Sequence, residues 1–242
     1  MIIKLMSLNI WNYNHFSERY EKIIAFIKKM NPDIIALQEV RDDSRRNRPG
    51  DNQLRQLNKR LAYKHHAYFK YADVNEINKR LDDKYYDPTN PKVLEGVALL
   101  SKFPIVKTYN RTLKRQKSDM YTRGILCARI NSKKAFNIFV VHFSADDLFS
   151  RLHLEETLEY AKSRNIQPII VGDFNIRIPG LAYGLASKDY VVSSDKFRYF
   201  SYPSKKEILD YILIPKSMSF KTFKCIKSNI SDHAALVAEI EV

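Results

Sequence analysis

The first forty residues predict a strand, a helix and a second strand. Residues 2–10 form a mostly apolar run that is typical of a buried strand. A helix is expected from Ser17 to Met30, because apolar residues recur there at helical spacing and Asn31-Pro32 follows as a stop signal. A second apolar run at 33–39 predicts another buried strand. A strand–helix–strand unit brings the ends of both strands to one edge of a sheet.

Further along the chain, short apolar runs separated by turns predict mainly strands. They are expected in the run between Pro168 and Gly172 and at 95–100, 104–110, 123–130, 135–142, 190–192, 208–214, 220–226 and 234–242. Helices are expected around 54–61 and over 146–164. The polar stretch 73–92 predicts an exposed loop or insertion.

These elements indicate an α/β (α+β) fold, because crossover units combined with meanders produce stacked sheets with helices outside. With 6 Gly, 9 Pro and no low-complexity tract, the chain is neither a repeat protein nor a fibre. Since no linker separates two parts, residues 1–242 are expected to form a single domain.

The net charge of +14 changes the picture, because it favours polyanionic partners such as nucleic acid, anionic lipid or polyphosphate. The alternative is that the surplus serves solubility or reflects a basic proteome. Nothing in the sequence indicates an obligate protein partner.

Cys127 and Cys225 both fall in predicted strands, and two buried, reduced thiols are a simpler interpretation than a disulfide or a metal site. No apolar run is long enough for a transmembrane segment, and residues 2–6 already form a strand pattern rather than a signal peptide. We therefore expect a cytoplasmic protein.

In one stretch, residues 167–177, candidate catalytic residues come directly after a predicted buried strand. Asp173 and Asn175 follow the apolar run, at the strand end where open α/β sheets bind ligands. On an extended backbone the two side chains point the same way, because the side-chain period of a strand is two. The alternative is a polar turn in which Asp and Asn serve only as turn formers.

Similar polar residues occur at the ends of other predicted strands. The set comprises Asn9, Glu39, His142, Asp173, Asn175, Asp210, Asp232 and His233. The four other histidines, at positions 15, 65, 66 and 153, have no such motif partner and are expected to be solvated or half-buried.

In order and composition, these segments resemble the endonuclease/exonuclease/phosphatase superfamily of metal-dependent phosphoesterases, which includes pancreatic-type deoxyribonucleases and abasic-site endonucleases. The resemblance extends from Asn9 to His233 and includes the strand-and-turn stretch 95–105. It implies a four-layer sandwich, with two packed mixed β-sheets flanked by helices and the site at one sheet edge.

The chemistry of a phosphoester independently favours a hard cation, since Mg²⁺ prefers oxygen ligands and often uses one or two carboxylates. Glu39 is the expected direct ligand, and Asn9 is expected to supply a carbonyl oxygen or an indirect contact. Asp232 is expected to join the metal shell directly or through water. Mn²⁺ is a possible substitute for Mg²⁺, whereas zinc is disfavoured because no thiolate or histidine cluster stands out.

Asp173 and Asn175 are expected to position the attacking water, with Asp173 as the candidate general base. Asp210 and His233 form a predicted carboxylate–imidazole pair, in which His233 either holds the phosphate as a cation or acts as the base. His142 is expected to donate to a phosphate or leaving-group oxygen.

Three further residues are predicted to orient groups or bind phosphate. Glu95 is a possible orienting partner of His142, and Arg123 resembles a phosphate-contacting arginine of the superfamily. For both, a surface ion pair is an equal alternative. Arg177 follows the Asp173–Asn175 motif, as in inositol polyphosphate phosphatases and protein–DNA adduct phosphodiesterases.

These features predict a Mg²⁺-dependent phosphodiester hydrolase, a nuclease or DNA-repair phosphodiesterase. Residues 196–202 interleave basic and aromatic side chains, a pattern suited to nucleic acid, although an amphipathic segment leading into a strand explains it equally well. One alternative is a phosphatase or phospholipase acting on inositol phosphates or sphingomyelin. Another is a catalytically inactive nucleic-acid-binding module.

Some departures leave the branch of the superfamily open. Trp11 stands where abasic-site endonucleases usually have an acid, and the two cysteines do not obviously supply the disulfides of the secreted deoxyribonucleases. The run around Asp210 differs from the Cys-Asp-Arg run of the inositol polyphosphate phosphatases.

Overall fold

Two six-stranded sheets form the centre of the protein. The computed structural model describes residues 1–80, 88, 89 and 93–242. The first sheet has the order β11 (Ser219–Ile226), β12 (Ala235–Glu241), β1 (Ile2–Asn9), β2 (Ile34–Asp43), β4 (Val93–Ser101) and β3 (His65–Asp73). The second has the order β5 (Ile105–Thr112), β6 (Gly124–Ile130), β7 (Phe136–His142), β8 (Ile169–Asp173), β10 (Asp210–Pro215) and β9 (Tyr190–Val192).

Both sheets are mixed. β1 pairs with β2 in parallel, and β7 pairs with β8 in parallel. The other strand pairs of the described residues are antiparallel. In each parallel pair a helix connects the strands: α1 (Phe16–Met30) joins β1 to β2, and α4 (Asp147–Ser163) joins β7 to β8. The crossovers bring the ends of β1, β2, β7 and β8 to one end of the two sheets.

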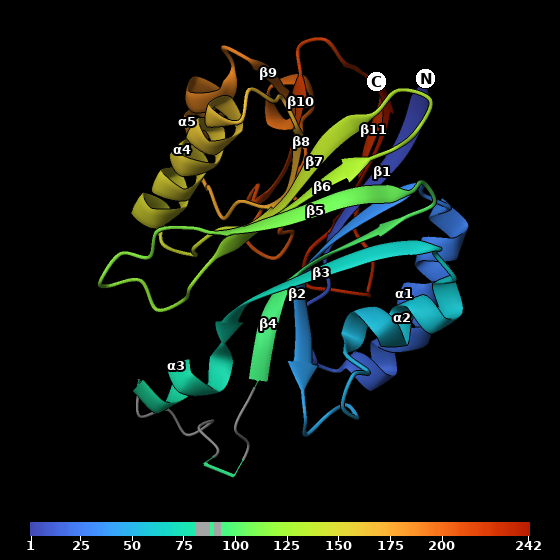
Figure 1. Ribbon diagram of the computed structural model, residues 1–242, viewed down its shortest axis with the longest axis vertical. Helices are drawn as coiled ribbons and strands as arrows, with labels where there is room; N and C mark the ends of the chain where they lie inside the picture. Colours follow the sequence, from blue (N-terminus) through green and yellow to red (C-terminus); the bar gives the residue numbers. More distant parts are fainter. Residues whose placement is uncertain (81–87, 90–92) are drawn as a thin grey trace.

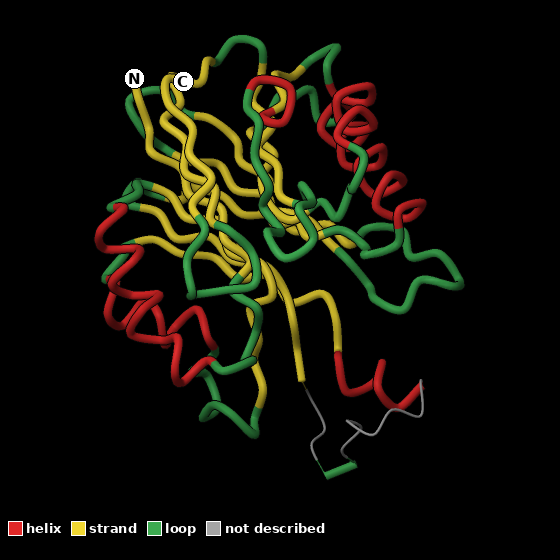
Figure 2. Tube along the Cα trace, turned by 180° about the vertical axis from the view of Figure 1, so that it is seen from behind, coloured by secondary structure: helices red, strands yellow, loops and turns green. Residues whose placement is uncertain are grey.

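Helices cover the outer faces of both sheets. Figure 1 shows α1 and α2 (Gln53–Leu61) beside the first sheet, and α4 and α5 (Pro179–Ala186) beside the second. The view from behind shows the same separation of the two helix layers (Figure 2). One apolar cluster joins α1 and α2 to their sheet, and another joins α4 and α5 to theirs. This arrangement confirms the expected four-layer sandwich.

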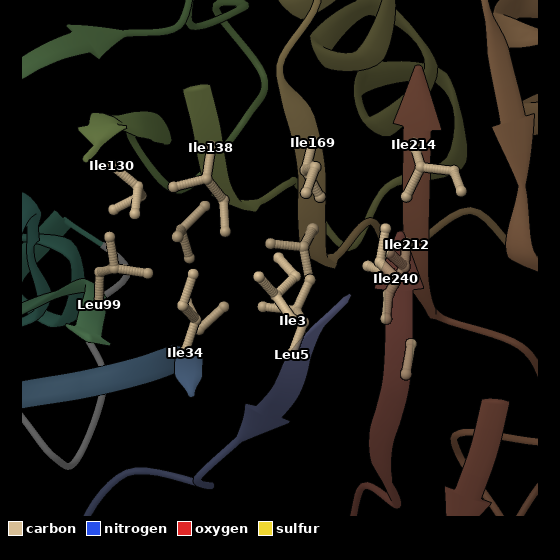
Figure 3. Packing of buried hydrophobic residues seen from close by; sticks show 14 of the residues in the cluster. Ile3, Leu5, Ile34, Leu99, Ile130, Ile138, Ile169, Ile212, Ile214 and Ile240 are labelled. Atoms are coloured by element: carbon tan, nitrogen blue, oxygen red, sulfur yellow. The ribbon is translucent and has the colours of Figure 1, made fainter. Parts of the chain in front are cut away.

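The inner core lies between the two sheets. Ile3, Leu5 and Ile34 of the first sheet face Ile138 and Ile169 of the second, all fully buried (Figure 3). The sequences of these strands are nearly continuous apolar runs because both faces are buried. One face packs against the other sheet, and the opposite face packs against helices.

Two elements, β3 and α3 (Val74–Arg80), differ from the sequence prediction. β3 was not expected, since its half-exposed side chains at the edge of the sheet give no apolar alternation. α3 replaces part of the loop expected at 73–92, because Asp73 Oδ1 accepts hydrogen bonds from the backbone N–H groups of Asn75 and Glu76 and so begins a helix. Residues 81–87 and 90–92 of that stretch lie outside the described residues.

Two short helices were also not expected. α5 begins with Pro179 in its first turn, a favoured position for proline, but its two glycines weaken the helical pattern. α6 (Ser193–Lys196) is a single turn after β9. Both cysteines are free thiols, as predicted; Cys127 is buried as expected, but Cys225, in the edge strand β11, is only half-buried. No helix in the described part of the chain has the length and apolar character needed to span a membrane.

Candidate functional site

The strand ends of both sheets meet at a polar pocket of about 340 Å³. Of the eleven residues that the sequence predicts for the site, nine line this pocket: Glu39, Glu95, Arg123, His142, Asp173, Asn175, Arg177, Asp232 and His233. The other two, Asn9 and Asp210, lie behind the wall and hydrogen-bond to lining residues. The structure therefore brings the whole predicted set together.

An irregularity in β2 turns Glu39 toward the pocket. The pairing with β4 shifts register between Leu37 and Val40, and Glu39 itself has a left-handed backbone with φ 54°. This conformation is uncommon for a residue other than glycine and is often retained at functional sites. The Glu39 carboxylate accepts hydrogen bonds from Nδ2 of Asn9 (3.1 Å) and Nδ2 of Asn12 (2.8 Å).

Asn9 links two carboxylates that come from different sheets. Its Nδ2 donates to Glu39 Oε1 and also to Asp173 Oδ2, both at 3.1 Å. Its Oδ1 accepts the backbone N–H of Trp11 at 2.9 Å. Since that oxygen is already engaged, the arrangement favours the indirect contact of the two roles that the sequence allowed for Asn9.

A close approach of the paired strands β7 and β8 sets the position of Asp173. Gly172 has φ 146°, and a β-carbon there would overlap the carbonyl oxygen of Val141. β8 ends at Asp173, whose Oδ1 accepts the backbone N–H of Asn175 at 3.0 Å in an Asx turn. Asn175 has φ 53°, so the expected extended backbone through both residues is wrong. Both side chains nevertheless line the pocket.

Burial makes two carboxylates of the pocket, those of Asp173 and Glu39, hard to ionise. It raises the pKa of Asp173 to about 7; nearby Asp210 and Glu39 add to the effect, while the cationic ring of His233 and the Asn9 hydrogen bond oppose it. Burial and the negative charge of Glu95 likewise raise the pKa of Glu39, against its hydrogen bonds from the two asparagines. Additional positive charge in the pocket would stabilise both ionised forms.

The pair of His233 and Asp210 supplies a buried cation. His233 Nδ1 lies 2.8 Å from Asp210 Oδ2. Burial alone would lower the pKa of His233, but the carboxylates of Asp210 and Asp173 outweigh it and hold that pKa well above its usual value. The imidazolium therefore persists at neutral pH, and its Nε2 lies 3.8 Å from Asp173 Oδ2.

His142 is held in the opposite state. Its Nδ1 lies 3.2 Å from Nη1 of Arg123, and because a guanidinium can only donate, Nδ1 accepts and the ring proton is on Nε2. Burial lowers the pKa of His142 well below its usual value, and the positive charges of Arg123 and His233 lower it further. His142 thus presents a neutral N–H donor, 3.7 Å from Asp173 Oδ2.

Glu95 does not orient His142 directly, contrary to the sequence interpretation. Its Oε2 accepts from Nε of Arg41 at 2.8 Å, and its Oε1 lies 3.9 Å from Nη1 of Arg123. Arg123 therefore stands between Glu95 and His142. Both Glu95 and Arg123 are buried, so the alternative of a surface ion pair is wrong as well.

Arg177 and Asp232 are two pocket residues that are only partly buried. Arg177 donates from Nη1 to the carbonyl of Ala145 and to Oδ1 of Asp147, the latter at 2.7 Å. Its side chain is one-third exposed. Asp232 is half-buried, and its Oδ1 accepts from the Ser231 hydroxyl at 3.1 Å.

Sequence reasoning missed several residues of the pocket wall. Asn12 holds Glu39, and Arg41 holds Glu95. Arg41 had a usable signal, because it lies only two positions after Glu39, but the strand predicted at 33–39 ends before it, whereas β2 extends to Asp43. The Tyr202 ring lies 5.0 Å from that of His233, a contact that no local pattern indicates.

Arg19 of α1, also missed, holds the loop that carries Asn12. It is buried and donates to the carbonyls of Ile10 and Ile230 at 2.9 and 2.6 Å, and also to those of Trp11, Asn12 and Asn14. These bonds tie residues 10–14 to the segment just before His233.

Replacing Arg19 by methionine is expected to destabilise the protein by about 2–4 kcal/mol, because several buried carbonyl groups lose their donor. Thermal or urea denaturation measures the loss. Lys22→Met, an exposed change on the same helix, is the matched control and should stay within about 0.5 kcal/mol of the wild type. Equal stabilities of the two variants would contradict this role of Arg19.

Comparison with known proteins identifies the family. A family model described as "Endonuclease/Exonuclease/phosphatase family" matches residues 6–233. The chain belongs to this family. Members of the endonuclease/exonuclease/phosphatase family are hydrolases that act on phosphoester bonds. No curated protein sequence matches the chain.

Solved structures show the same fold. An endonuclease/exonuclease/phosphatase from Beutenbergia cavernae DSM 12333 has a TM-score of 0.78 at 17% identity, covering 100% of this chain and 72% of that chain. The human Nocturnin catalytic domain with bound sulfate has a TM-score of 0.72 at 20% identity, covering 99% of this chain and 94% of that chain. The mannosyl-6-phosphatase of Bacteroides thetaiotaomicron VPI-5482 has a TM-score of 0.69 at 17% identity, covering 99% of this chain and 100% of that chain.

The endonuclease/exonuclease/phosphatase family generally depends on a divalent metal, and the donor set of this pocket fits one. Ligand atoms of Asp173, Asp210 and His233 lie within 4.8 Å of one another. Within the described chain, the buried Oδ1 of Asp210 has no hydrogen-bond partner. Together with Glu39 and Asp232, the pocket offers carboxylate oxygens, which hard cations prefer.

The raised carboxylate pKa values predict that metal binding depends on pH. At pH 6 Asp173 holds a proton in most molecules, whereas at pH 8 it does not, so a cation displaces fewer protons at pH 8. Mg²⁺ should therefore raise the melting temperature more at pH 8 than at pH 6.

The stability of the metal-free protein should also fall as the pH rises toward 7. A folded pKa above the unfolded value means that Asp173 stabilises the fold less as pH rises toward 7, and bound Mg²⁺ removes that loss. Thermal denaturation with and without Mg²⁺ at the two pH values measures the difference. An equal or larger shift at pH 6 would contradict a metal site beside these carboxylates.

Proposed function

We propose that the protein is a Mg²⁺-dependent phosphodiester hydrolase acting on nucleic acid, as a nuclease or DNA-repair phosphodiesterase. The observation that carries the proposal is the convergence of ionisation-resistant carboxylates with a buried imidazolium in one pocket. Such an arrangement suits an anionic ester that arrives with a divalent cation.

We assign the cation to Glu39, with Asp232 as a further oxygen donor, which leaves the Asp173 carboxylate free to act as the base. When bound, the cation neutralises phosphate charge and polarises the phosphoryl oxygen. Asn9 orients the Glu39 and Asp173 carboxylates through its two hydrogen bonds. Mn²⁺ should substitute for Mg²⁺, because both take oxygen ligands.

Asp173 acts as the general base in this proposal. A pKa of about 7 places its carboxylate close to the optimum for accepting a proton at neutral pH. Its Oδ1 is fixed by the backbone of Asn175, whose side chain lines the pocket beside it and positions the water. Nε2 of His142 and Nε2 of His233 lie 3.7 and 3.8 Å from Asp173 Oδ2, so both donors stand beside the base, where they would contact an oxygen of a bound phosphate.

Charge supports nucleic acid as the substrate class. The chain carries +14, and Arg41, Arg123, Arg177 and Lys205 line the pocket itself. Phosphatase or phospholipase action on inositol phosphates or sphingomyelin, and a catalytically inactive binding module, are the alternatives that the experiment separates.

The test is a substrate panel with Mg²⁺, beginning with bis(p-nitrophenyl) phosphate. Single-stranded, nicked and abasic DNA, RNA, inositol phosphates and sphingomyelin follow. We expect hydrolysis of the generic diester and of at least one nucleic acid, both abolished by chelator. Turnover of the inositol phosphates or sphingomyelin alone would overturn the nuclease proposal. Binding of nucleic acid without any hydrolysis would overturn enzymatic function.

A further inference from the structure

A second cavity lies beside the pocket, between residues 196–206 and strand β11. This hollow, which we call the aromatic–basic groove, has a volume of about 670 Å³. Its cations are Lys196, Arg198, Lys206 and Lys227, and among the described residues no acidic side chain lines it. The basic and aromatic stretch noted in the sequence thus forms a surface of its own.

Core packing explains only part of this stretch. The Phe197 ring stacks on Phe223 with centroids 4.5 Å apart and planes 4° apart. Tyr199 is buried, and its hydroxyl group hydrogen-bonds with Ser193 and the carbonyl of Asp210. These rings belong to the floor of the groove and support the alternative of an amphipathic segment for those two positions.

Phe200 and the cations have no such explanation. Phe200 is 54% exposed and makes no contact with another aromatic ring in the described part of the chain. Arg198, Lys206 and Lys227 form no ion pair with any described residue, and Lys196 has only its sequence neighbour Asp195, at 3.9 Å. An exposed ring among unpaired cations is suited to stacking a base while holding its phosphates.

The groove and the pocket share one wall. Residues 202–207 form a tight turn closed by backbone hydrogen bonds between Tyr202 and Glu207. Tyr202 and Lys205 of this turn line the pocket, whereas Pro203 and Lys206 line the groove. A chain whose phosphate lies in the pocket can therefore continue over the turn into the groove.

We propose that the aromatic–basic groove binds the single-stranded extension of a nucleic-acid substrate whose scissile phosphate lies in the pocket. Phe200 stacks an unpaired base, and the four cations contact the backbone phosphates. The inference rests on the proposed function for its substrate class. A single strand is favoured over a duplex because an unpaired base stacks on an exposed ring without the cost of unstacking a base step.

Binding of labelled oligonucleotides of about twelve nucleotides, a length typical of single-strand sites, tests the groove directly. Fluorescence anisotropy is measured in chelator, so that no cleavage occurs, with DNA and RNA oligomers and with a dinucleotide. We expect Phe200→Ala to weaken binding of the long oligomer about tenfold, and Phe200→Tyr to retain it. Arg198→Glu with Lys227→Glu should weaken it further and lower the salt slope by about 1.4, from two lost phosphate contacts.

A matched control changes charge elsewhere. Lys28→Glu with Lys64→Glu makes the same charge change in a separate basic hollow between α1 and the segment after α2. Because this hollow is not the groove, we expect only the small effect of the changed net charge, with oligomer binding within about twofold of the wild type. All variants should keep the wild-type kcat/KM on bis(p-nitrophenyl) phosphate, which is too small to reach the groove.

Several results would overturn the groove assignment. They are wild-type binding of the long oligomer by the Arg198/Lys227 variant, an equal loss in the control, and no preference of the wild type for the long oligomer over the dinucleotide. Phe200-dependent binding to anionic phosphatidylserine vesicles in place of the oligomer would assign the groove to a membrane surface instead. Failure to hydrolyse the small diester would overturn the proposed function without affecting these binding results.

Discussion

Asp173→Asn is expected to lower kcat/KM for bis(p-nitrophenyl) phosphate about 1,000-fold, the range for loss of a general base. The amide has nearly the same shape as the carboxylate and can still accept the backbone N–H of Asn175. It cannot accept a proton from water. Steady-state hydrolysis at saturating Mg²⁺ measures the loss.

Two controls separate this chemistry from folding. Asp189→Asn makes the same substitution at an exposed position and should leave kcat/KM unchanged. The melting temperature of metal-free Asp173→Asn should not fall by more than a few degrees, since the variant removes a buried carboxylate whose ionisation opposes folding. Retention of more than about one-tenth of wild-type activity would remove Asp173 from the role of base.

Glu39→Gln is expected to weaken Mg²⁺ binding about 100-fold or more, because the pocket loses the carboxylate assigned as the direct ligand. The amide has nearly the shape of the carboxylate, but its single oxygen can accept only one of the two hydrogen bonds from Nδ2 of Asn9 and Nδ2 of Asn12, so the change removes the charge and one acceptor. Titration of Mg²⁺ against both the melting temperature and the rate of hydrolysis measures the affinity.

The matched control is Glu159→Gln on the exposed side of α4. It should bind Mg²⁺ as the wild type does. Mg²⁺ at one hundred times its dissociation constant should stabilise the wild type by about 2.7 kcal/mol. The same Mg²⁺ concentration should hardly stabilise the Glu39 variant. An unchanged affinity would mean that the metal binds elsewhere.

Much of the fold was predictable from the sequence because the inner strands are buried on both faces. The runs around Ile35 and Ile170 are apolar without interruption, the run around Leu5 is mostly apolar, and the polar ends of these runs mark the site. β3 and α3 carried no such signal. The first is a half-exposed edge strand, and the second depends on a cap from Asp73.

The membership of the site was predictable, but its hydrogen bonding was not. Apart from Glu39 and Glu95, which lie inside β2 and β4, the members lie at or near strand ends, so strand order brings most of the set together. Which atom of Asn9 faces the carboxylates depends on the turn at Trp11, where its oxygen accepts the backbone N–H. Sequence spacing contains no information on such a contact.

Long-range partners were the other limit. Arg41 meets Glu95 because the two are paired across β2 and β4, and Arg123 reaches Glu95 from the start of β6 in the other sheet. A left-handed residue such as Asn175 likewise departs from the simple period of a strand. These features arise from tertiary packing, which local patterns do not encode.

The most direct measurement of the central claim is the position of Mn²⁺ in crystals of the protein, located by its anomalous scattering. The account predicts a peak within about 2.0–2.3 Å of a Glu39 carboxylate oxygen, lost in Glu39→Gln crystals, from a preparation that hydrolyses the diester. A peak bound only at other residues, in a protein that remains active, would contradict it.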